Sequence, residues 1–411
     1  MEYIKIEEAA LKWGLSVRRA QDLCRLGRVG GAKKFGNSWM IPENAAKPAD
    51  NRVKAENRVI KGFSLIRKSP FLDMTDLYNE AGCADKRIAE LDEYPESQAL
   101  FAAEIAYSRG DIDGVYESAT EFLKKDNSFY TVISSGMLLA LVAMWKGDIT
   151  LWRQAKKHIY EAPWKDRTDR DIISLSIAAT ELSVRNTVDF PEWFYRGRFE
   201  ILPADALPAA RVYYNKYLLI YAQELAGGKR NIDDISGLGL MRSQPFILEP
   251  MISQAVSEKT VIVEIYLRLL CATVYLQIGD KENAAFHLDR AILLCLPDRL
   301  FGTLVEHRRQ LGLFLDERLM LADPEAAKKV KTLHKTLHEG WVKIHNEVLQ
   351  KDITAKLSDR EREVARLAAF GLSDEQIADR LHITKASAKS ILQMARNKTG
   401  IKNRLDFGAY M

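Results

Sequence analysis

Near the end of the chain, apolar side chains recur at helical spacing and polar residues mark the limits of each helix. Three groups of apolar residues each fall on one helix face: Val364, Leu367 and Ala368, then Ile377, Ala378 and Leu381, then Ala388, Ile391 and Leu392. Capping boxes precede the first two groups, Ser358 with Glu361 and Ser373 with Gln376, and Gly371 stands between them as a left-handed terminator. The pattern predicts three short helices, the third running from Lys385 to about Lys398.

The outer face of the third predicted helix is polar and basic. We expect it to bind DNA, because such side chains supply the donors, acceptors and positive charge that base edges and phosphates require. The candidate DNA-binding residues at this end of the chain are Thr384, Lys385, Ser387, Lys389, Ser390, Gln393, Arg396, Lys398 and Arg404.

Residues 357–404 resemble the helix-turn-helix domain of LuxR-type regulators. The segments that carry the resemblance are Leu357-Ser-Asp-Arg-Glu-Arg-Glu-Val364, Gly371-Leu-Ser-Asp-Glu-Gln-Ile-Ala378 and Lys398-Thr-Gly-Ile-Lys-Asn-Arg404. The resemblance implies that the third helix lies in the major groove and that a fourth helix, near Asn403 to Tyr410, pairs two copies into a homodimer. Ser387, Ala388, Ile391 and Thr399 depart from the family's usual residues. The predicted domain spans residues 355–411.

The first 48 residues contain a second unit in which helical spacing gives way to short strands. A helix is predicted from Ile6 to Trp13, Gly14 ends it, and Ser16 caps a second helix through Leu26. Val17, Ala20, Leu23 and Cys24 are expected to face its interior. Two strand-like runs then flank Gly36-Asn37, a pair typical of a hairpin turn with a basic tip.

This unit resembles the small winged-helix DNA-binding domain of excisionase-like and MerR-type proteins. The matching segments are Trp13-Gly-Leu-Ser16, Gly27-Arg-Val-Gly-Gly-Ala32 and Ser38-Trp-Met-Ile-Pro42. The resemblance implies that the second helix enters a groove and that the hairpin contacts the backbone or minor groove. The candidate DNA-binding residues are Ser16, Arg18, Arg19, Gln21, Arg25, Lys33, Lys34 and Asn37. Trp39 is interpreted as a core anchor of the wing, with base stacking as the alternative.

Between the two ends, a polar linker is predicted at 49–70 and a helical domain at 71–350. Gly-Asp corners at residues 110–111, 147–148 and 279–280 separate helical stretches, and Leu270 to Ala291 has the small and large residues of a tetratricopeptide hairpin. The predicted fold is therefore mainly α: an N-terminal winged helix with a small β-hairpin, a central tetratricopeptide-like helical repeat domain, and a C-terminal LuxR-type helix-turn-helix bundle.

Charge is distributed unevenly along the chain. Residues 1–62 hold 13 Lys or Arg against 7 Asp or Glu, and residues 354–411 hold 11 against 7, so both ends are basic, whereas the middle holds 36 against 42. Basic modules at each end suit a polyanion, and double-stranded DNA is the expected partner. The acidic N-terminus differs from a secretory signal, and the apolar run Met137 to Trp145 is shorter than a bilayer span. We therefore expect a cytoplasmic protein without a membrane partner.

The sequence carries no recognised catalytic frame, so no enzyme activity, no cofactor and no metal site are predicted. A phosphate-binding glycine loop is missing, and the four cysteines lack metal-ligand spacing. His334, His338 and His345 share a helix face at spacings that metals use, but a solvated face is the preferred interpretation. The aromatic stretch 191–199 is interpreted as core packing, with an effector pocket as the alternative.

The leading hypothesis is a sequence-specific transcription regulator of bacterial type. Its central helical domain would act as a sensor or interaction domain for a small-molecule or protein effector. The alternative is a helical-repeat scaffold whose end modules bind proteins and not DNA.

Overall fold

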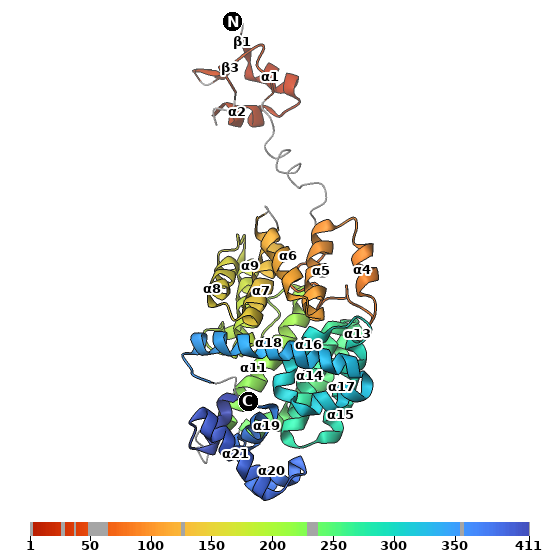
Figure 1. The fold of residues 1–411 in the computed structure, drawn as a ribbon. Coiled ribbons are helices and arrows are strands. Elements are labelled where there is room, and N and C mark those ends of the chain that lie inside the picture. The colour runs from red at the N-terminus through yellow and green to blue at the C-terminus, as the bar shows by residue number, and fades with distance from the viewer. Residues whose placement is uncertain are drawn as a thin grey trace. The chain divides into compact units, whose positions relative to one another are not determined.

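The structure is a computed structural model that describes residues 3–25, 29–36, 38–47, 65–124, 128–227, 237–353 and 357–410, without the side chains of residues 19, 22, 226, 227, 409 and 410. The chain divides into two compact units, residues 1–62 and 63–411. The described part is mainly helical with one small sheet, which confirms the coarse fold class (Figure 1).

The N-terminal unit packs two helices against a three-stranded antiparallel sheet of order β1-β3-β2. Its elements are β1 Tyr3–Lys5, α1 Ile6–Trp13, α2 Val17–Arg25, β2 Lys33–Phe35 and β3 Ser38–Pro42. Ile4 pairs with Ile41 and Lys34 with Trp39, so the predicted strand runs do form a hairpin. Gly14 ends α1 with a φ of 64°. Val17 is 38% exposed and does not join the core, whereas Trp39 packs against it half-buried.

The regular elements in the described part of the second unit are all helices. Its first part, called the body below, has the elements α4 Ala84–Glu90, α5 Pro95–Arg109, α6 Ile112–Lys124, α7 Phe129–Lys146, α8 Ile149–Tyr160, α9 Arg167–Ser183, α10 Glu192–Tyr195, η1 Ala204–Ala206, α11 Leu207–Gly227, α12 Gly237–Ser243, α13 Pro245–Glu258, α14 Val261–Ile278, α15 Lys281–Cys295, α16 Phe301–Leu311, α17 Leu313–Ala322 and α18 Pro324–Leu349. The C-terminal elements are α19 Asp359–Ala369, α20 Asp374–Leu381, α21 Lys385–Thr399 and η2 Arg404–Tyr410.

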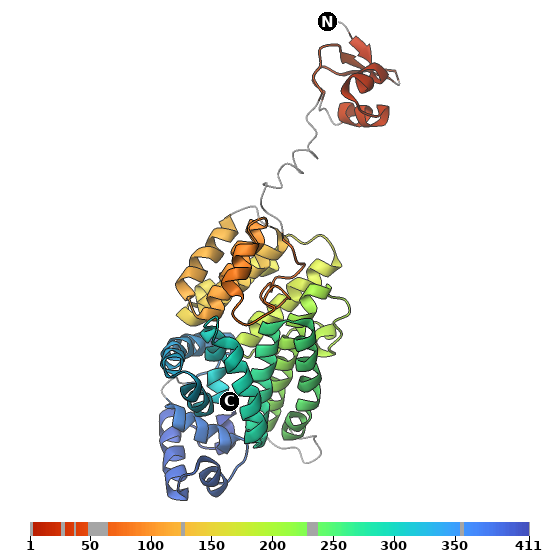
Figure 2. The ribbon, with the colours of Figure 1, turned by 90° about the vertical axis from the view of Figure 1, so that its right-hand side faces the viewer.

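The predicted Gly-Asp corners join the helix pairs α5/α6, α7/α8 and α14/α15, which lie side by side in the body (Figure 2). Each glycine has a positive φ, between 64° and 97°, which residues with a Cβ adopt at a cost. Asp148 and Asp280 cap the helices that follow by accepting hydrogen bonds from backbone N–H groups. The corners are therefore helix terminators and starters, as predicted. The tetratricopeptide resemblance itself stays a prediction.

Two helices of the body, α7 and α14, are long and apolar enough to cross a membrane by length and composition. The sequence prediction considered only the shorter run within α7. In the structure, 72% of the α7 window and 89% of the α14 window are buried inside the body. Their apolar character is accounted for by neighbouring helices on nearly every side, as expected of core helices.

Helix α18 crosses the body and contacts α7, α8, α16 and α17 (Figure 1). Gly340 allows its close approach to α7. A Cβ added at this position would lie 2.5 Å from the carbonyl oxygen of Trp145 and closer still to that of Met144.

We expect Gly340→Ala to lower the free energy of unfolding by about 3 kcal/mol, because two helix backbones must separate to admit the methyl group. Urea titration followed by circular dichroism measures the change. The matched control is Glu339→Ala at the exposed neighbouring position, where helix propensity favours alanine slightly. Equal stability of the two variants would contradict the close crossing.

Candidate nucleic-acid interface

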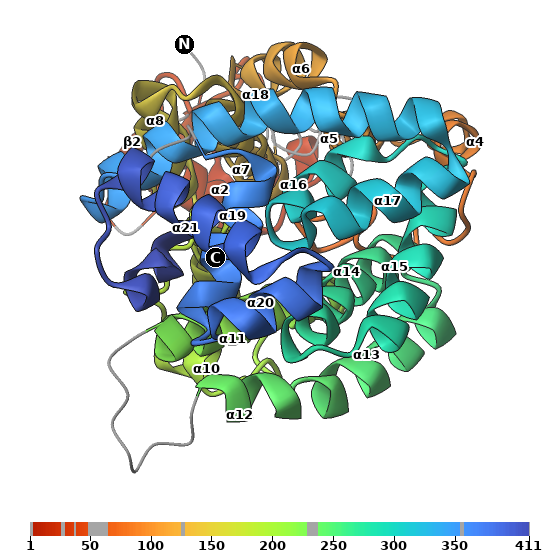
Figure 3. The ribbon, with the colours of Figure 1, turned by 60° about the horizontal axis from the view of Figure 1, so that its bottom comes forward.

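The three helices α19, α20 and α21 form the C-terminal domain (Figure 3). Ser358 accepts a hydrogen bond from the Glu361 N–H and donates its own N–H to the Glu361 carboxylate, and Ser373 and Gln376 repeat this arrangement. Thr384 caps α21 by accepting from the Ser387 N–H. The predicted capping boxes and the third helix are confirmed, and the predicted inward positions are buried or half-buried. Local sequence thus determines both the length and the start of each helix.

The outer face of α21 is exposed and basic. Four residues on this face are exposed: Lys385, Lys389, Ser390 and Gln393. Successive members of this set are four, one and three residues apart along the helix. Lys385 lies 3.5 Å from Glu375, and Gln393 donates to Asn397 at 3.0 Å, both of which are contacts between exposed groups. Such weak surface contacts are readily exchanged for contacts with a ligand.

Residues 355–410 match the model of the bacterial regulatory proteins of the LuxR family. The C-terminal domain is a LuxR-family helix-turn-helix domain. The match supports DNA-binding transcription regulation and covers only this end of the chain. No curated protein and no solved structure matches the chain.

Other candidate residues of the LuxR-type domain have partners inside it. Lys398 binds the carboxylate of Glu361 at 2.8 Å, and Arg404 binds Asp374 at 3.1 Å and the carbonyl oxygen of Leu372 at 2.6 Å. Thr384 and Ser387 contact each other at 2.8 Å in the first turn of α21. Thr384 and Lys398 remain exposed, whereas Ser387, Arg396 and Arg404 are half-buried.

The segment expected to form a fourth helix is η2, a 3₁₀ helix that packs against α19 and against α11 of the body. Its Phe407 is fully buried. A dimer that paired through this segment would require η2 to leave α11.

The N-terminal candidates lie on α2 and on the hairpin. Arg18, Gln21, Arg25, Lys33 and Lys34 are exposed, and Ser16 directly precedes α2. The Lys33 ammonium lies 5.8 Å from the centre of the Tyr3 ring. The side chain of Arg19 and the whole of Asn37 lie outside the described residues. The described candidates give this unit a basic surface of its own.

Arginine side chains bind the LuxR-type domain to the body, and the sequence did not predict these contacts. Arg308 on α16 binds Asp359 of α19 at 2.8 Å and Asp316 of α17 at 2.6 Å. Arg362 of α19 donates to His338 of α18 at 3.0 Å. Arg366 and Arg380 donate to carbonyl oxygens of Gln310 and Leu276, respectively.

Burial of two arginines, which the sequence does not reveal, marks this docking in the structure. Arg362 and Arg366 stand one turn apart on a short helix whose apolar face is already accounted for. Both are buried, at 7% and 6% exposure, although arginine is rarely buried without a partner. Two arginines of this kind indicate a second covered face.

The prediction of a solvated face for His334, His338 and His345 is wrong. They are 5%, 8% and 1% exposed, because α18 is covered by helices of the body and by α19. His334 Nδ1 lies 3.0 Å from Arg308, and His345 Nδ1 lies 2.8 Å from the carbonyl oxygen of Val184. Burial and neighbouring arginines lower the pKa values of all three, to about 3 for His334 and His345. They are neutral hydrogen-bonding groups at pH 7.

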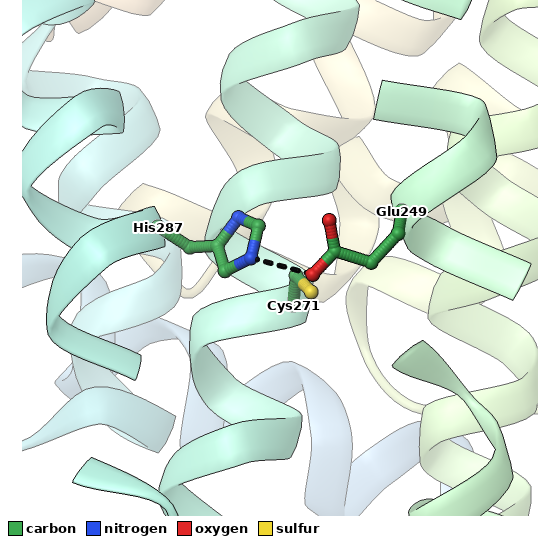
Figure 4. A group of neighbouring side chains, drawn as sticks. All are labelled: Glu249, Cys271 and His287. Atoms are coloured by element: carbon green, nitrogen blue, oxygen red, sulfur yellow. Dashed lines mark hydrogen bonds and ion pairs between the residues drawn. The ribbon is translucent and has the colours of Figure 1, made fainter. Parts of the chain in front are cut away.

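One group of described residues brings three potential metal ligands together: Glu249 on α13, Cys271 on α14 and His287 on α15 (Figure 4). Their donor atoms lie within 4.8 Å of one another. Glu249 already binds His287 at 3.0 Å and accepts from the Tyr275 hydroxyl at 3.2 Å. Burial raises the pKa of the Cys271 thiol, which disfavours the thiolate that metals bind. We assign no metal here, and the predicted absence of a metal site can be tested at this group.

The aromatic stretch 191–199 packs as a cluster and not as an open pocket lining. Phe194 is fully buried and meets Phe190, Phe199 and Tyr217 at centroid distances of 5.2 to 6.2 Å. Edge-to-face contacts of this kind stabilise a core. The geometry favours the core-packing interpretation.

Proposed function

We propose that the protein is a sequence-specific regulator of transcription in which α21 enters the major groove of double-stranded DNA. The observation that carries this proposal is the exposed, basic outer face of α21 in a LuxR-family domain. Lys385 and Lys389 contact phosphates, while Ser390 and Gln393 have the donors and acceptors that read base edges. The half-buried Arg396 and Arg404 position the helix, and the exposed Lys398, which pairs with Glu361, adds positive charge at its C-terminal end.

The N-terminal unit acts as a second DNA reader of the winged-helix type. Its basic residues on α2 and β2 are exposed, which supports this role. Because one chain carries both readers, binding by one raises the effective concentration of the other at a neighbouring site. The body senses an effector or a partner, the chain is cytoplasmic, and homodimerisation extends recognition to palindromic sites. No enzymatic activity is part of this proposal.

The double variant Lys385→Gln with Lys389→Gln is expected to weaken DNA binding at least tenfold. It should also reduce the slope of log affinity against log salt by about 2, because two phosphate contacts are lost at about 0.9 each. The measurement is a salt titration of binding to DNA fragments that the wild type enriches from a genomic pool. The control is Lys331→Gln with Lys335→Gln, two exposed lysines of α18.

The outcome of the salt titration separates the two hypotheses. An unchanged slope in the α21 variant would remove α21 from the DNA interface. Failure of the wild type to retain any DNA at about 0.15 M salt, a physiological level, would favour the scaffold function.

A further inference from the structure

The body contains a pocket between α7, α9, α11, α16 and α18. It has a cavity volume of about 70 Å³ and is partly open to solvent. Its apolar wall includes Met144, Leu182, Ile220, Leu337 and Trp341. All five are buried, so the wall is a preformed apolar surface of the kind that small-molecule sites use.

The polar lining of the pocket has an excess of positive charge. It contains Arg185, Lys216 and Arg309 but a single carboxylate, Glu306. That carboxylate is also engaged elsewhere, because it accepts a hydrogen bond from the Tyr107 hydroxyl at 2.6 Å. Three cations against one carboxylate leave a net charge of +2 in a largely desolvated space.

Neither Arg185 nor Lys216 forms a direct ion pair with a described residue, and the carboxylates that act on them, Glu224 and Glu306 respectively, do so only at longer range. Arg185 is 8% exposed and its guanidinium donates only to the amide oxygen of Gln223 at 2.8 Å. Lys216 makes neither a hydrogen bond nor an ion pair with a described residue. Burial lowers the pKa of Arg185 to about 10 and also lowers that of Lys216. Arg185 is buried and Lys216 is half-buried, and charges placed in this way destabilise a fold unless something compensates them.

Arg185 also has an unusual backbone conformation. Its φ is 62°, in the left-handed region that residues with a Cβ rarely adopt. This conformation closes the C-terminal end of α9, where the Arg185 N–H donates to the Leu182 carbonyl oxygen at 3.1 Å. It places a buried guanidinium at the pocket at a cost to stability.

The pocket histidines supply further hydrogen-bond donors. Arginine can only donate, so His338 Nε2 must accept from Arg362, and the proton of the neutral ring is on Nδ1. His338 Nδ1 is buried and has no partner. The same reasoning places the His334 proton on Nε2, because His334 Nδ1 accepts from Arg308. The lining therefore offers cations and N–H donors, which match an anion.

We propose that this pocket binds a small organic anion, with its carboxylate or phosphate group between Arg185, Lys216 and His338 and its apolar part against Leu337 and Ile220. The Trp341 ring supports this wall from behind, because the Arg309 guanidinium lies 3.7 Å from its centre and His345 stacks on it at 4.3 Å. This proposal rests on the proposed function, since it identifies the effector class that the body senses.

The same histidines connect the pocket to the LuxR-type domain. His334 contacts Arg308, which binds Asp359 at the start of α19, and His338 contacts Arg362 on the same helix. An anion that attracts or reorients these rings acts on both arginines. Pocket occupancy is thereby coupled to the docking of the DNA-binding domain. The coupling means that the ligand binds the docked state and the released state with different affinities.

Isothermal titration calorimetry of the full chain tests the site independently of DNA. The probes are benzoate, its uncharged counterpart benzamide, and inorganic phosphate, all at constant ionic strength. We expect saturable binding of benzoate or phosphate and at least tenfold weaker binding of benzamide. Benzoate binding identifies a carboxylate site, and phosphate binding without benzoate binding identifies a phosphate site.

Arg185→Gln and Lys216→Met should each weaken anion binding at least tenfold, while Lys335→Met on the exposed side of α18 should not. Both pocket variants remove a charge that has no direct ion pair with a described residue, so their thermal midpoints should equal or exceed that of the wild type. Wild-type protein that binds neither anion, or variants that bind as the wild type does, would overturn the site.

Repeating the DNA retention assay with the anion present tests the coupling. A change of threefold or more in DNA affinity in the wild type, lost in Arg185→Gln, supports it. Anion binding without any change in DNA affinity overturns the coupling and leaves the site. Anion binding by a protein that retains no DNA overturns the proposed regulator, again without affecting the site.

Discussion

Replacing Arg308 with methionine is expected to lower the free energy of unfolding of the helical unit by about 3–5 kcal/mol, the usual cost of removing one partner from a buried ion pair. The Arg308 side chain is 2% exposed and neutralises two carboxylates, Asp316 and Asp359. Without the guanidinium, both carboxylates stay partly buried at 22% and 30% exposure. His334 also loses the donor to its Nδ1. Urea titration monitored by circular dichroism measures the loss.

Arg318→Met is the matched control, because Arg318 forms an exposed ion pair with Asp289. The Arg318 side chain is 34% exposed and the Asp289 side chain is 38% exposed. An exposed pair contributes about 0.5 kcal/mol. A double-mutant cycle of Arg308→Met with Asp359→Asn isolates the contact between the body and the LuxR-type domain, and we expect a coupling energy of at least about 1.5 kcal/mol. Additive effects would show that the arginine stabilises the body alone.

The position of these contacts explains how the domain can be docked and still read DNA. α19, α20 and η2 face the body, whereas the basic side of α21 stays exposed (Figure 3). Docking therefore restricts the direction from which the domain meets DNA without covering its reading face. It also places η2 against α11, so release of the domain and pairing through η2 would occur together.

Much of the local structure could be predicted because it depends on neighbouring residues. The capping boxes at Ser358 and Ser373 and the terminators Gly14 and Gly371 act over three or four residues, and each has the predicted role. The Gly-Asp corners behave in the same way. Apolar spacing also identified the buried side of α21, since a helix places residues three and four apart on one face.

The tertiary contacts could not be predicted in this way. His334 and His338 stand on a helix rich in lysine, and periodicity alone assigns them to its solvated side. Only the crossing of α18 with α7 and the docking of α19 bury them. The pocket cations Arg185 and Lys216 are 31 residues apart on different elements, so no motif spacing connects them. Burial of charge by distant segments leaves no local signal.

Acidification is expected to destabilise the helical unit, because five of its described histidines are buried and have a lowered pKa, His287 among them. Burial lowers the pKa of His307 to about 4 and, with nearby arginines, that of His334 and His345 to about 3, and it also lowers the pKa of His338. The reference pKa is 6.5, so below pH 6.5 the unfolded chain binds protons that the folded chain excludes. Each histidine then costs about 1.4 kcal/mol per pH unit.

Two buried carboxyl groups oppose this effect. Burial raises the pKa of Asp73 to about 7 and raises that of Glu104, so the folded chain binds protons at these groups before the unfolded chain does. His307, His334, His338 and His345 against two carboxyl groups leave a net uptake of about two protons on unfolding, and His287 adds to this uptake in the same direction. The free energy of unfolding should therefore fall by about 3 kcal/mol per pH unit between pH 6 and pH 5.

Single substitutions test this proton balance. His307→Gln should reduce the slope near pH 5 by about one proton, or about 1.4 kcal/mol per pH unit, and Glu104→Gln should steepen it by a similar amount. His158→Gln, at an exposed position, controls for loss of an imidazole. Urea titrations at a series of pH values give the slopes. An unchanged slope in His307→Gln would show that the His307 ring is already protonated in the folded chain. The charged ring would then have to be accommodated beside the Thr303 carbonyl oxygen and the Tyr266 ring.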